Sequence, residues 1–183
     1  MKSDQELLNK VIASLPNLDE VGVARSIILY KLLRELYYRN TDILGNELFK
    51  WAYSAYYGLS SHYKKTEINQ YFIVLQKYVS CKSPLSVDKI VAELNTQKKQ
   101  YVFATKLMNF VDDEKYPIVD RKIAILFGFS VNDIFSSKYD TVLRVYELLL
   151  KRKELCIILN EYDFTGIGKM KQVDIILWNI NHN

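Results

Sequence analysis

The stretch of sequence that decides the fold is VDKIVAELNTQKKQYVFATKLMNFVDDEKYPIVDRKIAILF, residues 87–127. Val87–Leu94 and Tyr101–Val111 both carry apolar residues at helical spacing, and a short polar turn separates them. After a loop, residues 117–127 predict a third helix that is opened by an Ile-Val-Asp turn. The stretch therefore predicts two helices joined by a hairpin-like turn, followed by a helix that begins near Asp120.

Apolar periodicity predicts further helices on both sides of this stretch. In the helix that follows Asp19, we expect an inward-facing apolar stripe of Val21, Ala24, Ile28, Leu32 and Leu36. Ile27, Leu29 and Leu33 widen this stripe until little polar surface is left, so we expect a central helix. The next helix along the chain is expected to start at Thr41 or Asp42 and to stop at Gly58. The remaining predicted helices cover residues 7–15, 66–79, 139–159 and 169–180.

Composition favours one all-α domain covering residues 1–183. The chain is 49% apolar and 25% charged, which is ordinary for a globular protein and excludes disorder. Only six glycines and three prolines occur in 183 residues, and strands with tight hairpins need these residues more than long helices do. We therefore predict a multi-helix bundle.

Several site types are disfavoured by the residues that the chain lacks. Cys81 and Cys156 have no motif spacing, and we interpret them as reduced core thiols of a cytoplasmic protein. With two histidines, one of them the near-terminal His182, an imidazole-based metal site is not expected, and no cofactor is predicted. No apolar run approaches the ~20 residues of a membrane span. The net charge of +4 permits a nucleic-acid partner without requiring one.

The stretch 87–127 resembles the helix-hairpin-helix DNA glycosylase superfamily, especially its small 8-oxoguanine-type members. The resemblance rests on the hairpin, on a helix with the pattern Ala-x-x-(apolar) from Ala104, and on the element Pro-x-x-Asp from Pro117 to Asp120. Ala104 and Asp120 are 16 residues apart, as in that family. The resemblance covers about 40 residues and implies a DNA-repair fold in which a damaged base is flipped into a pocket between helical layers.

The resemblance implies a role for each part of this stretch. Asp120 would be the catalytic carboxylate beside the sugar C1′, where positive charge grows as the glycosidic bond breaks. A hairpin at a helix N-terminus would offer backbone N–H groups to a DNA phosphate. The candidate DNA contacts of this stretch are Lys98, Lys99, Gln100, Lys106 and Arg121.

The sequence departs from the family pattern at two points. The usual Gly-x-Gly of the hairpin is replaced by Lys98 and Gln100, so the turn has no glycine. The lysine that forms a Schiff base in bifunctional members is replaced by Val102, and neither Lys99 nor Lys106 occupies that position. Water-mediated base removal or DNA binding alone is compatible with these residues. Asp120 also has a simpler interpretation, as the N-cap of its helix.

A second hairpin-like turn occurs near the C-terminus, in the sequence Gly166-Ile167-Gly168-Lys169. It lacks the spacing of a nucleotide-binding P-loop, so nucleotide hydrolysis is not expected. Gly166, Gly168 and Lys169 are candidate phosphate contacts, and an ordinary helix-capping loop is the alternative. Similarly, the pairs Tyr37-Tyr38 and Tyr56-Tyr57 have two interpretations, base stacking or core packing.

Three functions remain open from the sequence. The first is a divergent, monofunctional DNA glycosylase that uses Asp120. The second is a non-catalytic DNA-binding module on the same fold, which Val102 and the missing glycines favour. The third is a helical interaction protein without nucleic acid, which the mild charge favours.

Overall fold

The computed structural model describes residues 3–81, 83–95, 100–129 and 138–181, and these form ten α-helices and two short 3-10 helices. The α-helices are α1 (Asp4–Ser14), α2 (Glu20–Arg39), α3 (Glu47–Tyr57), α4 (Lys65–Val79), α5 (Val87–Leu94), α6 (Tyr101–Val111), α7 (Arg121–Phe127), α8 (Tyr139–Leu149), α9 (Lys153–Asn160) and α10 (Lys169–Trp178). The 3-10 helices are η1 (Leu15–Asn17) and η2 (Leu59–Ser61). The predicted all-α class is confirmed.

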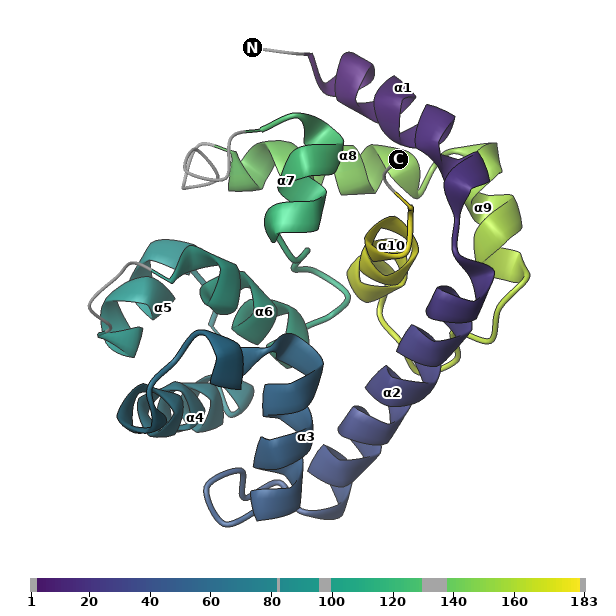
Figure 1. The fold of residues 1–183 in the computed structure, drawn as a ribbon. Coiled ribbons are helices and arrows are strands. Elements are labelled where there is room, and N and C mark those ends of the chain that lie inside the picture. Colours follow the sequence, from purple (N-terminus) through teal and green to yellow (C-terminus); the bar gives the residue numbers. More distant parts are fainter. Residues whose placement is uncertain (1–2, 82, 96–99, 130–137, 182–183) are drawn as a thin grey trace.

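The helices gather on two sides of α10, as Figure 1 shows. On one side α4, α5 and α6 pack together, with α3 beside them (Figure 1). On the other side α1 packs against α7 and α8, and α10 also contacts these two helices. The long helix α2 joins the sides because it contacts both α3 and α10. This arrangement places the start of α7 and one face of α10 between the two groups of helices.

The segment between α1 and α2 is held against the segment that follows α10. Leu18 and Ile180 form an isolated antiparallel bridge. The backbone N–H of Asp19 donates to the Asn179 carbonyl at 2.8 Å, and that of Asn181 donates to the Asn17 carbonyl at 2.9 Å. Because these bonds tie the end of α10 to the start of α2, the two helices have a fixed relative position.

Local capping signals predicted several helix boundaries correctly. Asp19 caps α2 by accepting the backbone N–H of Gly22, as its position before the apolar stripe indicated. Gly58 ends α3 in the left-handed conformation, with φ of 70°, where a side chain would be strained. In α6 the predicted apolar face is buried, including Ala104, Leu107 and Met108.

Other predicted boundaries were wrong. The third helix begins at Glu47 rather than at Thr41 or Asp42, because Asn46 accepts the backbone N–H of Phe49 and acts as the N-cap. The predicted helix over 139–159 is two helices, α8 and α9, with residues 150–152 between them. Residues 117–119 precede the helix, which begins at Arg121, with the predicted opening residue Asp120 as its N-cap. The last helix ends at Trp178 instead of Ile180.

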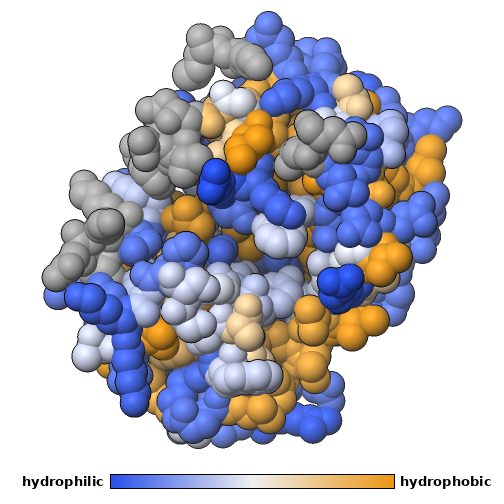
Figure 2. Space-filling model, in the orientation of Figure 1, coloured by the Kyte–Doolittle hydropathy of each residue, from blue (hydrophilic) through white to orange (hydrophobic). Residues whose placement is uncertain are grey.

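The predicted inward stripe of α2 was right for Ile27 and Leu33 but wrong for several other residues. Val21 is 70% exposed and Ile28 66% exposed, whereas the residues that α2 buries are Gly22, Val23, Ile27, Tyr30 and Leu33. The helix is apolar on more than one side, and packing against α3 and α10 selects the buried side. In Figure 2, apolar side chains are visible on the molecular surface where α2 and α3 lie.

Neither cysteine is part of the core, in contrast to the prediction. Both thiols are free, but Cys81 is exposed and Cys156 is only half-buried. Among the residues that the structure describes, no helix combines the length and apolar character that crossing a membrane requires.

Candidate functional site

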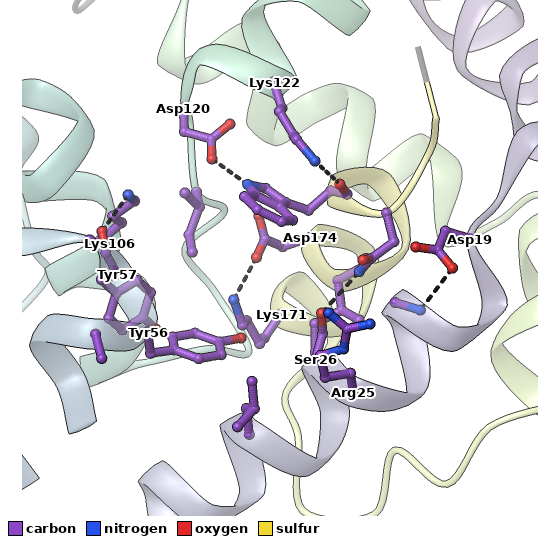
Figure 3. Close-up of a pocket in the computed structure, with 18 of the residues that line it drawn as sticks. Asp19, Arg25, Ser26, Tyr56, Tyr57, Lys106, Asp120, Lys122, Lys171 and Asp174 are labelled. Atoms are coloured by element: carbon purple, nitrogen blue, oxygen red, sulfur yellow. Dashed lines mark hydrogen bonds and ion pairs between the residues drawn. The ribbon is translucent and has the colours of Figure 1, made fainter. Parts of the chain in front are cut away.

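A cavity of about 600 Å³ lies between the two groups of helices. Its walls come from α2, α3, α6, α7 and α10 and from the loop that precedes α7, as the close-up in Figure 3 shows. Ligand sites in proteins typically have volumes of about 300–1,000 Å³ and are lined by aromatic side chains with a few convergent polar groups. This cavity has that size and includes aromatic side chains, but charged side chains make up a larger share of its lining.

Asp120 reaches this cavity from the N-terminus of α7. Its Oδ1 accepts the backbone N–H of Ile123 at 3.1 Å, and its Oδ2 accepts the indole N–H of Trp178 at 2.7 Å. The residue is only 8% exposed. Asp120 is therefore both the N-cap of α7 and part of the cavity wall. The two hydrogen bonds come from different helices and fix the orientation of the carboxylate.

Trp178 is held on its other side by Lys122. The ammonium of Lys122 lies 3.7 Å from the centre of the indole ring and donates to the Trp178 carbonyl at 3.0 Å. A cation over an aromatic face is attracted by the ring quadrupole. The indole is thus positioned between Asp120 and Lys122, and 44% of the residue stays exposed at the cavity.

A buried ion pair forms another wall of the cavity. Lys171 Nζ lies 2.6 Å from Asp174 Oδ2, and both residues are almost fully buried on α10. The rings of Tyr30, Tyr56 and Tyr57 surround this ammonium, with centres 5.1–5.6 Å away. Figure 3 shows the pair on the face of α10 that points toward α3.

Burial and mutual attraction shift the pKa values of this pair. Burial alone would lower the pKa of Lys171, but the neighbouring Asp174 carboxylate and the tyrosine hydroxyls raise it overall. Burial raises the pKa of Asp174, and the opposing effect of Lys171 offsets this only in part. The ammonium form of Lys171 is therefore strongly favoured.

Lys106 enters the cavity from α6, on the side of α3 (Figure 3). Its Nζ donates to the backbone carbonyl of Tyr57 at 2.9 Å. Burial lowers the pKa of Lys106, and attraction to Asp120 and Asp174 opposes this effect. In total, four basic and three acidic side chains of the described residues line the cavity.

Of the predicted site residues that the structure describes, Asp120 and Lys106 line the cavity. Arg121 is exposed beside Asp120, and Gln100 is half-buried at the N-cap of α6. Lys98 and Lys99 lie outside the described residues, so their predicted phosphate contacts remain predictions.

The turn with Gly166, Gly168 and Lys169 lies elsewhere. The backbone N–H of Gly168 donates to Asp113 Oδ2 at 3.1 Å, and that of Lys169 donates to Glu114 Oε2 at 2.8 Å. The Lys169 side chain also pairs with Glu114. Because carboxylates occupy these N–H groups, the turn joins α10 to the loop after α6, and we do not include it in the site.

Sequence reasoning missed Lys171, Asp174 and Trp178. These residues are at positions i, i+3 and i+7, so they share one face of α10. Lysine and aspartate among apolar residues on that face are a detectable signal, because charged residues are seldom fully buried unless paired.

The described residues contain no group of three or more histidine, cysteine or acidic side chains that could hold a metal ion. A scan against models of known protein families, a search of curated proteins and a search of solved structures each found no match for this chain.

Proposed function

We propose that this protein is a monofunctional DNA N-glycosylase that removes a damaged base, with Asp120 as its key carboxylate. The observation that carries the proposal is that Asp120 lines a cavity of about 600 Å³ with both of its oxygens held by hydrogen bonds. The resemblance of residues 87–127 to the helix-hairpin-helix glycosylases supplies the reaction class. Extrusion of a base into a fitted pocket is how such enzymes reach their target bond.

Asp120 would stabilise the positive charge that develops on the sugar as the C1′–N bond breaks. A carboxylate about 4 Å from a unit charge contributes on the order of 4 kcal/mol at an effective dielectric of 20. A carboxylate accepts about four hydrogen bonds, and two acceptor positions of Asp120 are used. The others are available to the sugar or to the attacking water. Preorganised charge of this kind does not need to reorient during the reaction.

Trp178 and Tyr56 would hold the flipped base through their rings. Both line the cavity, and the indole is already fixed by Asp120 and Lys122. Stacking of a base on an aromatic side chain is worth about 1–3 kcal/mol and does not depend strongly on base identity. The aromatic walls therefore favour a planar ligand.

The turn between α5 and α6 would bind the DNA backbone. The two helices contact each other, and α6 continues from the turn to Lys106. Gln100 precedes Lys106 by six residues, which is about 9 Å along a helix axis. A phosphate held at Gln100 would thus lie about 9 Å along α6 from Lys106, which lines the cavity.

Base release from defined duplexes tests the proposal. The protein is incubated with duplexes that carry 8-oxoguanine, uracil or 7-methylguanine, and free base is measured by mass spectrometry while abasic sites are measured by alkaline strand cleavage. We expect release from at least one duplex by the wild type and none above background by Asp120→Asn. No release from any duplex would contradict the catalytic role.

A non-catalytic DNA-binding module is the second candidate. It is favoured by the same hydrogen bonds, because a carboxylate that accepts both Ile123 N–H and Trp178 N–H also suits a purely structural cap. This candidate predicts salt-dependent binding that weakens when Lys98 and Lys99 are replaced by alanine, without base release. Fluorescence anisotropy of a labelled duplex at several salt concentrations separates it from a protein that does not bind DNA.

A further inference from the structure

The Lys171–Asp174 pair leaves one polar atom without a partner at the cavity wall. Asp174 Oδ2 accepts the Lys171 ammonium, but Asp174 Oδ1 is buried and has no hydrogen-bond partner within the described ranges. The hydroxyl of Tyr57, also in the cavity wall, is buried and unpaired within the same ranges. Both unpaired atoms thus belong to residues that line the same cavity.

An unpaired buried carboxylate oxygen is costly in a folded protein. Stability does not explain the pair either, since buried ion pairs are often no more stabilising than apolar residues of similar volume. Oδ1 is closed to water in the structure, so the Asp174 side chain must turn toward the cavity before a hydrogen-bond donor there can satisfy it and remove this cost. An ionised carboxylate only accepts hydrogen bonds, so the group it selects must carry an N–H or O–H.

We propose that Asp174 Oδ1 accepts a hydrogen bond from the pairing edge of the extruded base, and that the substrate is therefore a base with a free N–H on that edge. This inference rests on the proposed function. The ammonium of Lys171 has three protons, of which one is donated to Asp174, and it would donate another to a carbonyl or ring nitrogen beside that N–H. Tyr57 would complete the contact through its hydroxyl.

The proposal separates two classes of damaged base. Deaminated and oxidised bases and purines alkylated at N7 keep an N–H on the pairing edge. Bases that are alkylated on that edge, such as ethenoadenine and N3-methylated uracil, have lost it. A site built to bond an N–H rejects an analogue without it strongly, because the polar group of the protein then stays unpaired. The protein would act on the first class only.

Free bases and their methyl-blocked analogues test this without any catalytic step. In a Trp51→Phe background, Trp178 is the only tryptophan, so its fluorescence reports on the cavity. Uracil is compared with 3-methyluracil, and hypoxanthine with 1-methylhypoxanthine. We expect each N–H base to bind at least about tenfold more tightly than its methylated analogue.

Asp174→Asn provides the matched variant. Its amide oxygen would face Lys171, and its NH2 group would stand where the wild type has the free acceptor. We therefore expect the affinities for each N–H base and its methylated analogue to differ by no more than about twofold. If this variant does not fold, as judged by circular dichroism, the comparison in the Trp51→Phe protein still decides the question. Equal affinity for blocked and unblocked bases, or no binding of either, would overturn the inference.

The outcome is independent of the proposed glycosylase activity. Selective binding of N–H bases without base release from DNA would leave the inference standing and refute the catalytic proposal. Base release without this selectivity, including release of ethenoadenine from a duplex, would support the catalytic proposal and refute the inference about Asp174.

Discussion

Replacement of Lys171 by methionine should destabilise the protein strongly, because it leaves the Asp174 carboxylate buried without its partner. Both side chains are at most 4% exposed, so water cannot replace the lost contact. Breaking a buried pair by removing one partner costs about 3–5 kcal/mol. For a chain of this length that corresponds to a fall in melting temperature of roughly 6–20 °C.

Urea unfolding followed by far-ultraviolet circular dichroism at pH 7 measures the effect. The double variant Lys171→Met with Asp174→Leu removes both charges, and we expect it to lie within about 1 kcal/mol of the wild type or above it. As a surface control, Lys77→Met breaks the pair with Glu93, whose side chains are 59% and 25% exposed, and should cost less than about 1 kcal/mol.

The stability of Lys171→Met should also depend on pH in a defined direction. The pKa of Asp174 is raised by burial in the wild type, and loss of the Lys171 charge raises it further. A group whose pKa is higher in the folded state stabilises that state when it is protonated, so its contribution grows as the pH falls through the folded pKa. The difference in unfolding free energy between the wild type and Lys171→Met should therefore narrow from pH 7 toward pH 5.

Two results would refute the reasoning about the buried pair. One is a loss of less than about 1 kcal/mol of unfolding free energy in Lys171→Met. The other is a double variant, Lys171→Met with Asp174→Leu, that is as unstable as Lys171→Met alone.

Three further predictions concern the loop after α6 and the cavity. Gly168→Ala should lower the melting temperature by several degrees, because its Cβ would lie 2.4 Å from the backbone carbon of Asp113. Thr165→Ala, which shortens an exposed side chain on the same turn, is the control. Trp178→Phe should fold normally but release base about tenfold more slowly, since it loses the hydrogen bond to Asp120 and keeps the ring; an unchanged rate would count against that contact. Sodium borohydride should trap no covalent adduct with abasic-site DNA, because Lys106 is held by a backbone carbonyl; an adduct band on a denaturing gel would show lyase chemistry instead.

Helix type and many helix ends were predictable because their causes are local in the sequence. Asp19 caps α2 and Gly58 ends α3, and each acts within a few residues of its own position. The break between α8 and α9 has no such signal, since residues 150–152 are Leu-Lys-Arg without glycine or proline. Tertiary packing decides where that helix ends.

The buried side of α2 was not predictable from periodicity because the helix has apolar residues around much of its circumference. Val21, Ile28 and Leu32 are equally apolar candidates, yet all three are exposed. The choice depends on α3 and α10, whose positions follow from contacts distant in the sequence.

The candidate site was predictable only in part for the same reason. Asp120 was singled out because residues 87–127 resemble the helix-hairpin-helix glycosylases. Lys171, Asp174 and Trp178 come from a helix about fifty residues later, and only the fold brings them to the cavity that contains Asp120. Likewise, the carboxylates of Asp113 and Glu114 that occupy the N-terminus of α10 are remote from it in sequence.

The single-turnover rate of base release by Asp120→Asn tests the central claim most directly. The asparagine keeps the N-cap of α7, so the fold and the duplex affinity should stay close to those of the wild type. Loss of about 4 kcal/mol of charge stabilisation predicts a rate on the order of a thousandfold lower. A variant that binds the duplex equally well and releases base at the wild-type rate would contradict the account.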